Sequence, residues 1–205
     1  RRQRQMCIRD RLYIRICYNI GSIFLPQGRT VFIEEANMAK YFPLFIDISE
    51  KTFLVVGAGN IAVRRILKLK EFGCKIIVVA KTIAATIMDQ QDDRLILKER
   101  AYDSMDVEDV DYVIAATNNK ELNEKIVWDC NRAGIMVNDA SNYKNCDFYF
   151  PGIVTEEEMV IGVTSSGSNH RLARRVASEI RYNIKEVVTR CKKELEEDPN
   201  AEKFD

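Results

Sequence analysis

The stretch Phe53-Leu54-Val55-Val56-Gly57-Ala58-Gly59-Asn60-Ile61-Ala62 decides the fold of this chain, because an apolar run ends in two glycines and helical spacing follows. The four consecutive large apolar residues predict a strand that is buried on both faces. Gly57 permits a tight turn, Gly59 lets a phosphate approach the backbone, and Ala62 keeps the next helix close to the sheet. That helix would present N–H groups and its positive dipole end to a pyrophosphate. The alternative is a turn between strand and helix that holds no ligand.

The segments after this turn alternate between the patterns of strands and helices. Apolar runs predict strands over 75–80, 95–97, 109–117 and 135–138, and helical spacing predicts helices over 61–72, 82–88 and 121–132. This alternation with short connections specifies an α/β fold, a doubly wound parallel Rossmann-like sheet with right-handed crossovers. Ligands of such sheets lie over the carboxyl ends of the strands. The residues predicted there, 57–61, 80–82, 116–118 and 138–142, form the candidate cofactor site.

One expected feature is missing at the end of the second strand. A NAD-specific fold usually places Asp or Glu there to hold the ribose 2′-OH, whereas this chain has Ala80, Lys81 and Thr82. Lys81 could tolerate the 2′-phosphate of NADP. It could equally be a solvated surface lysine.

The composition is that of an ordinary globular protein. Of 205 residues, 46% are hydrophobic and 30% are charged, with a formal net charge of +0. This balance indicates neither nucleic acid nor a membrane surface as the main partner, and no apolar run approaches the roughly 20 residues that span a bilayer. The six cysteines form no CxxC pair, which favours reduced thiols in a cytoplasmic protein.

The first 37 residues differ from the rest of the chain. They hold seven arginines and three acidic residues, with short apolar runs that follow no clear period. We expect residues 1–37 to be a leader that is not part of the fold, with Met38 as the natural start. Residues 41–47 then read as a short edge segment that precedes the first strand of the sheet.

The pattern changes after the fifth strand. Residues 148–154 and 158–164 predict an antiparallel pair of strands, and a loop rich in small hydroxyl residues then leads into a helix over 172–188. Four arginines are expected on one face near the start of this helix: Arg171, Arg174, Arg175 and Arg181. Hydroxyls, free N–H groups and arginines together would clamp carboxylates. The alternative is a solvated helix with an ordinary N-cap.

Four motifs together are similar to the precorrin-2 dehydrogenase family, the stand-alone relative of the N-terminal part of siroheme synthase. They are Tyr41-Phe-Pro-Leu-Phe45, the turn Gly57-Ala-Gly-Asn-Ile-Ala62, Ala115-Ala-Thr-Asn118, and Cys146-Asp-Phe-Tyr-Phe-Pro-Gly-Ile-Val154 leading to Thr164-Ser-Ser-Gly167 and Leu172-Ala-Arg174. The resemblance extends from about residue 38 to residue 188.

The resemblance implies an enzyme of siroheme biosynthesis that oxidises precorrin-2, a tetrapyrrole with eight carboxylates, to sirohydrochlorin with NAD. Some family members also insert ferrous iron. It implies a homodimer with a NAD-binding Rossmann domain (38–147), a dimerisation and substrate region (148–170) and a helical C-terminal module and tail (171–205). The positions that match the family's dinucleotide contacts are Asn60, Ile61, Lys81 and Thr82. With Gly57, Gly59 and Thr117, which are predicted at the carboxyl edge, they form the candidate cofactor-binding residues. The family's active-site serine matches Ser165.

The catalytic residues match the family only in part. The family's active-site aspartate falls on Ser141, and Asp139, two residues earlier, would face the same side of an extended segment. Asp139 is therefore the candidate base, with capping of a turn as the alternative. His170, the only histidine, is a candidate second proton carrier.

Substrate carboxylates are expected at Ser165, Ser166, Arg171 and Arg174. No metal site is expected from one histidine and dispersed cysteines. Two other functions stay open at this point. One is a different NAD(P)-dependent oxidoreductase, and the other is a non-enzymatic dinucleotide-sensing module.

Overall fold

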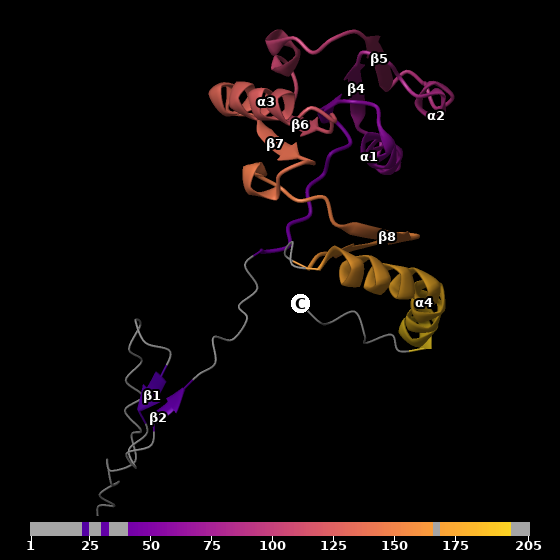
Figure 1. The fold of residues 1–205 in the computed structure, drawn as a ribbon. Coiled ribbons are helices and arrows are strands. Elements are labelled where there is room, and N and C mark those ends of the chain that lie inside the picture. Colours follow the sequence, from indigo (N-terminus) through magenta and orange to yellow (C-terminus); the bar gives the residue numbers. More distant parts are fainter. Residues whose placement is uncertain (1–21, 25–29, 33–40, 166–168, 198–205) are drawn as a thin grey trace, which may run out of the picture. The chain divides into compact units, whose positions relative to one another are not determined.

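The computed structural model describes residues 22–24, 30–32, 41–165 and 169–197. The chain divides into two compact units, residues 1–42 and residues 43–205. In the first unit, β1 (Ser22–Phe24) and β2 (Thr30–Phe32) pair antiparallel (Figure 1). The rest of the expected leader over 1–37 lies outside the described residues, apart from these two strands.

The second unit contains the predicted sheet. It has five strands: β3 (Thr52–Val56), β4 (Lys75–Ala80), β5 (Leu95–Glu99), β6 (Tyr112–Ala115) and β7 (Met136–Asp139). All neighbours are parallel, in the order β5-β4-β3-β6-β7. The strand order reverses between β3 and β6, which is where such sheets bind ligands. The predicted Rossmann-like α/β fold is confirmed.

Helices connect these strands. The segments are α1 (Asn60–Lys70), α2 (Ala85–Met88), η1 (Ser104–Val107) and α3 (Lys120–Ala133). One of them, η1, was not predicted from the sequence. α2 is shorter than the predicted 82–88, since its first residues form the bend that follows β4. Gly134 ends α3 in the left-handed conformation with φ of 70°, a conformation that glycine adopts without strain.

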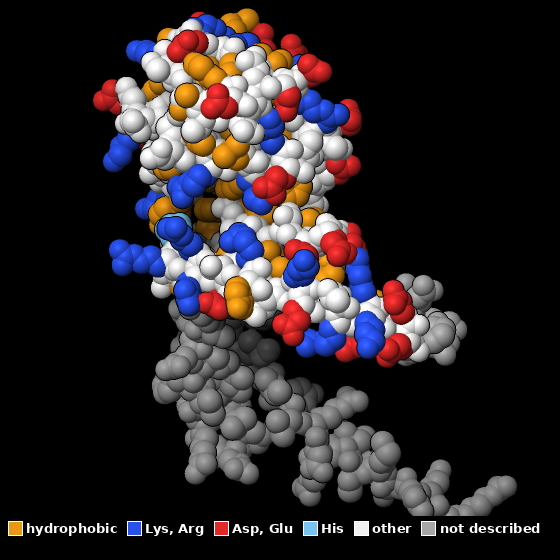
Figure 2. All heavy atoms as spheres, turned by 90° about the vertical axis from the view of Figure 1, so that its right-hand side faces the viewer, with side chains coloured by type: hydrophobic (Ala, Val, Ile, Leu, Met, Phe, Trp, Pro, Cys, Tyr) orange, Lys and Arg blue, Asp and Glu red, His pale blue; other side chains and the backbone are white. Residues whose placement is uncertain are grey.

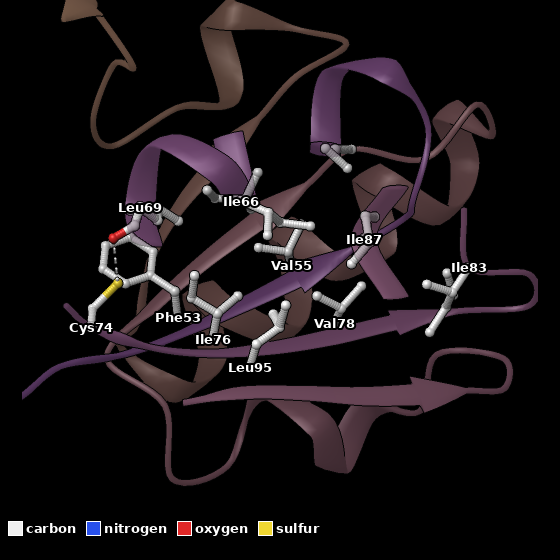
Figure 3. Close-up of a cluster of buried hydrophobic side chains, with 14 residues drawn as sticks. Phe53, Val55, Ile66, Leu69, Cys74, Ile76, Val78, Ile83, Ile87 and Leu95 are labelled. Carbon is white, nitrogen blue, oxygen red and sulfur yellow. Dashed lines mark hydrogen bonds between the residues drawn. The ribbon is translucent and has the colours of Figure 1, made fainter. Parts of the chain in front are cut away.

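Two apolar clusters hold the sheet between its helices. The cluster on the α1 side joins Phe53 and Val55 of β3 to Ile66 and Leu69 of α1, as Figure 3 shows. The opposite cluster packs alternate strand residues against α3, among them Ile126 with no exposed surface. The strands are therefore buried on both faces, as expected from their continuous apolar runs.

An antiparallel hairpin and a long helix follow the sheet. After η2 (Tyr143–Asn145), the strands β8 (Gly152–Glu156) and β9 (Met159–Val163) pair antiparallel, as predicted, and α4 (His170–Glu197) packs against them (Figure 1). A Cβ on Gly152 would lie 3.1 Å from the Ala177 Cβ. A glycine here therefore allows close helix packing.

α4 continues past the predicted end at residue 188. Its Lys192 Nζ lies 3.0 Å from an oxygen of Glu158 and also pairs with Glu157, which ties the last turns to the hairpin. Within the described residues, no helix combines the length and apolar character that crossing a membrane requires.

The prediction of an edge segment over 41–47 is wrong. These residues form no strand, and the side chains of Phe42, Leu44 and Phe45 are 87%, 73% and 68% exposed. Aromatic and aliphatic residues in a short run are typical of a strand, but strand formation also needs a partner.

Candidate functional site

Gly57 is the point at which the sheet requires a glycine. Its φ is +110°, and a Cβ would lie 2.4 Å from the Ala116 carbonyl oxygen. Its N–H donates to the Val79 carbonyl oxygen over 2.9 Å. The turn therefore brings the ends of β3, β4 and β6 together, which leaves no room for a side chain.

The beginning of α1 is open where a dinucleotide phosphate would approach. Gly59 is the N-cap, no side chain caps the helix, and the first turn carries no acidic residue. A Cβ built on Gly59 has no atom within 4 Å, and Asn60 and Ile61 are exposed. The backbone N–H groups and the helix dipole fit an anion at this position, so the residues present suit a pyrophosphate.

Asn123 links the loops that follow β6 and β7. Its Oδ1 accepts from the Thr117 hydroxyl over 2.6 Å and from the Thr117 N–H over 3.2 Å. Its Nδ2 donates to the Thr117 carbonyl and to the Ser141 hydroxyl, both over 3.1 Å. Asn123 has no exposed surface, and sequence reasoning missed it. The signal was a polar residue three positions before Ile126, on the buried face of a helix.

Asp139 holds the loop after β7. Its Oδ1 accepts from the Ser141 N–H over 2.8 Å, the Ser141 hydroxyl over 2.6 Å and the Asn142 N–H over 3.2 Å. Its Oδ2 accepts from the Asn145 side chain over 3.2 Å, and the residue is 2% exposed. These contacts agree with the alternative that Asp139 caps a turn, and they leave Oδ2 as the less occupied oxygen.

Arg65 of α1 is a second residue that sequence reasoning missed. Its Nη1 donates to Asn138 Oδ1 over 2.5 Å, and its guanidinium carbon lies 5.5 Å from the centre of the Phe150 ring. Burial lowers the pKa of this guanidinium. Asn138 Nδ2 in turn donates to the Phe148 carbonyl over 2.7 Å. The pair therefore joins α1 and β7 to the segment that leads into the hairpin.

Lys81 and Thr82 follow β4 and are both exposed. The carboxyl edge thus brings Gly57, Thr117, Asp139 and Ser141 together, through close approach at Gly57 and the hydrogen bonds of Asn123.

The second predicted group lies at the start of α4. His170, Arg171 and Arg174 are exposed, and Figure 2 shows Lys and Arg side chains around the histidine. The Asn169 Oδ1 accepts from the Leu172 N–H over 2.9 Å, which is an N-cap. Asn169 N–H donates to the Ser165 hydroxyl over 3.1 Å. Ser166 lies outside the described residues.

Two arginines of the predicted face have partners within the chain. The Arg181 Nη2 donates to the Ile153 carbonyl over 3.0 Å, and the Arg175 Nη2 lies 2.7 Å from Glu179 Oε1. Arg181 therefore anchors the hairpin, whereas Arg175, which is also exposed, pairs with Glu179 on its own helix.

The two buried cysteines, Cys74 and Cys130, do not have the character of nucleophiles or metal ligands. Burial raises the pKa of Cys74 to about 11 and that of Cys130 to about 12. Such thiols are protonated at neutral pH, whereas the thiolate is the reactive and metal-binding form. Within the described ranges, no three His, Cys, Asp or Glu side chains group as metal ligands would.

Comparisons with known proteins agree with this geometry. A family model described as putative NAD(P)-binding matches residues 44–152. A solved structure named "SirC, precorrin-2 dehydrogenase" is similar with a TM-score of 0.59 and 25% identity, over 70% of this chain and 71% of that one.

Curated relatives are longer proteins. The chain is 42% identical over 142 residues to a probable multifunctional siroheme biosynthesis protein HemA of Ruminiclostridium josui, covering 68% of this chain and 28% of the relative. It is 30% identical over 152 residues to a siroheme synthase of Nitrosococcus oceani, covering 74% of this chain and 32% of the relative. The chain thus spans about three tenths of the length of these relatives.

Proposed function

The chain belongs to the family of putative NAD(P)-binding proteins, and from this premise we propose that it is an enzyme that oxidises precorrin-2 to sirohydrochlorin with NAD. The predicted resemblance to precorrin-2 dehydrogenase and the N-terminal part of siroheme synthase is confirmed by the relatives and the solved neighbour. The observation that carries the proposal is the glycine turn. No atom lies within 4 Å of a Cβ built on Gly59, and Gly59 is the N-cap of α1, which no side chain caps. The turn follows β3, where the strand order of the sheet reverses.

The dinucleotide would be held at the carboxyl edge of the sheet. The N–H groups at the start of α1, at Asn60 and Ile61, would bind the pyrophosphate, and Gly59 leaves space for its approach. The parts of the dinucleotide on either side of the pyrophosphate would lie next to Lys81, Thr82 and Thr117. When bound, NAD supplies the hydride acceptor. The protein supplies orientation of the substrate and a group that takes a proton.

The start of α4 is the proposed substrate side. Arg171 and Arg174 are exposed cations that follow Ser165 and Ser166 in the sequence, and arginine binds carboxylates through paired hydrogen bonds. A substrate with eight carboxylates would use such groups for orientation. A small neutral substrate would not need them, which disfavours an oxidoreductase of that kind.

Asp139 is the first candidate for the proton acceptor. Its Oδ1 already accepts three hydrogen bonds, so a proton would be taken at Oδ2, which accepts one. Ser141 orients this carboxylate through its hydroxyl, and His170 is the second candidate. For a base, Asp139→Asn should lower kcat by about 10²- to 10⁴-fold. If Asp139→Asn lowers the unfolding free energy but leaves kcat unchanged, Asp139 stabilises the loop and is not the base.

The proposal extends to assembly and location. It assigns NAD binding to 38–147, dimer and substrate contacts to 148–170, and a helical module to 171–205, in a cytoplasmic homodimer. The exposed Met159 and Val160 on β9 support a partner at the hairpin, since they are 46% and 37% exposed. Sedimentation analysis tests the dimer. Iron insertion would be a separate activity, tested with ferrous iron and sirohydrochlorin.

The deciding experiment is a turnover assay. Purified protein is mixed with precorrin-2 and NAD, and the absorbance of sirohydrochlorin is followed. The expected result is product formation that depends on NAD. Binding of dinucleotide without any product would refute the enzymatic proposal and favour a sensing module.

A further inference from the structure

The second strand of the sheet lacks the acidic residue that usually holds the adenosine ribose of NAD. β4 ends at Ala80, and the next residues are Lys81 and Thr82. Ala80 belongs to the apolar cluster on the α1 side, so this strand end faces the same side of the sheet as the helix of the glycine turn. Ala80 therefore occupies the position from which an acidic side chain usually binds the ribose, but its methyl group cannot accept a hydrogen bond.

The neighbouring strand brings a carboxylate to this place. In the parallel register of β4 and β5, the Cα partner of Ala80 is Glu99. Paired residues of adjacent strands project to the same face. Leu95 and Leu97, which alternate with Glu99 along β5, pack on the α1-side cluster and confirm this orientation.

The Glu99 carboxylate reaches around the end of β4. Its Oε1 accepts from the Ile83 N–H over 3.3 Å, and the residue is exposed. A carboxylate has about four acceptor positions, so this contact leaves capacity for a sugar diol.

The cations near the end of β5 are engaged on the other face. Lys98, the partner of Val79, lies with its Nζ 3.8 Å from Asp106 Oδ1. The Arg100 Nη1 donates to Asp106 Oδ2 over 2.7 Å. These two side chains are thereby directed to Asp106, and the α1 face at this position carries the negative charge of Glu99.

From this juxtaposition we propose that Glu99 binds the adenosine ribose hydroxyls and selects NAD over NADP, an inference that rests on the dinucleotide site of the proposed function. The carboxylate accepts from the 2′-OH of NAD and repels the 2′-phosphate of NADP. The acidic residue expected at the end of β4 is thus supplied by β5. Lys81 does not determine the preference between NAD and NADP.

The test measures binding rather than turnover. Calorimetric titration of the full chain with NAD, 2′-deoxy-NAD and NADP gives three dissociation constants. For the native chain, NAD is expected to bind about 10-fold more tightly than 2′-deoxy-NAD, the size of one hydrogen bond to a charged group. NADP should bind more weakly than NAD by at least that factor.

The variant Glu99→Gln keeps an oxygen for the Ile83 N–H and removes the charge. It should lose most of the preference for the 2′-OH and bind NADP more tightly than the native chain does. Glu124→Gln, at an exposed position on α3, is the matched control and should leave all three constants unchanged. Thermal unfolding shows that each variant is folded.

Two results would overturn the inference. If Glu99→Gln binds the three dinucleotides in the native ratios, Glu99 does not contact the ribose, although the dinucleotide site stands. If the native chain binds none of them, the proposed function fails and the inference fails with it.

Discussion

Replacing Gly57 by alanine separates the requirements of the fold from those of the ligand. A Cβ at this position would lie 2.4 Å from the Ala116 carbonyl oxygen and 2.7 Å from its carbon. Both atoms belong to backbone at the end of β6, so they cannot rotate away. The φ of +110° is also unfavourable for alanine. Strain at such a φ costs about 1–3 kcal/mol and forced repacking costs a similar amount, so Gly57→Ala should lower the unfolding free energy by about 2–6 kcal/mol.

Gly59→Ala is the matched comparison two residues away. Its φ is −78°, and a Cβ would meet no atom within 4 Å. The unfolding free energy should therefore fall by no more than about 1 kcal/mol, from the weaker N-cap. The added methyl group would lie where the phosphate is expected to bind. The affinity for the dinucleotide should therefore fall at least about 10-fold, which is a loss of roughly 1.4 kcal/mol in binding free energy.

Urea denaturation followed by circular dichroism gives the unfolding free energy of each variant, and calorimetry gives the NAD dissociation constant. A domain of this size has about 5–15 kcal/mol of stability, so Gly57→Ala should be severely destabilised or unfolded. Native-like stability of Gly57→Ala would refute the steric reasoning. Unchanged NAD affinity of a folded Gly59→Ala would refute the phosphate position.

Three further predictions follow from other contacts. Burial raises the pKa of Asp106, but the hydrogen bonds from Arg100 and the Asp103 N–H, together with the charges of Arg100 and Lys98, outweigh burial and hold the pKa below its ordinary 3.8. The carboxylate therefore stabilises the fold above that value, so Asp106→Asn should cost about 1–3 kcal/mol at pH 7 and progressively less below about pH 4 in urea titrations. Asn123→Ala should lower the unfolding free energy by about 1–3 kcal/mol, measured in the same way. Arg174→Ala should raise KM for precorrin-2 about 10-fold with kcat nearly unchanged, whereas Arg190→Ala, near the other end of α4, should change neither in the turnover assay.

The strands were predictable because their signal is local. The run 53–56 is apolar at every position, and β4 has the predicted bounds 75–80. The segment 41–47 has similar residues, but it pairs with neither edge strand of the sheet, β5 or β7. Pairing is a long-range property, so composition alone could not decide this segment.

The candidate site was predictable in outline for the same reason. The carboxyl ends of parallel strands share one edge, which placed Gly57, Thr117 and Asp139 together from the order of the elements. The residues that hold the loops were not visible. Arg65 and Asn138 are 73 positions apart, and Asn123 and Ser141 are 18 apart. Glu99 required the register of two strands, which the sequence does not contain.

The two sides of the carboxyl edge differ in a way that bears on binding. On the β6 and β7 side, Asn123, Thr117, Ser141 and Asp139 bind one another. On the α1 and β4 side, the helix start is uncapped and Glu99 makes one long hydrogen bond. A ligand gains most where polar groups are not already paired. Dinucleotide affinity should therefore come mainly from the α1 and β4 side, whereas the β6 and β7 side fixes the conformation of the neighbouring loops. Ser141→Ala would then act through the loop, and a double-mutant cycle with Asn123→Ala should show coupling in the unfolding free energy rather than in NAD affinity.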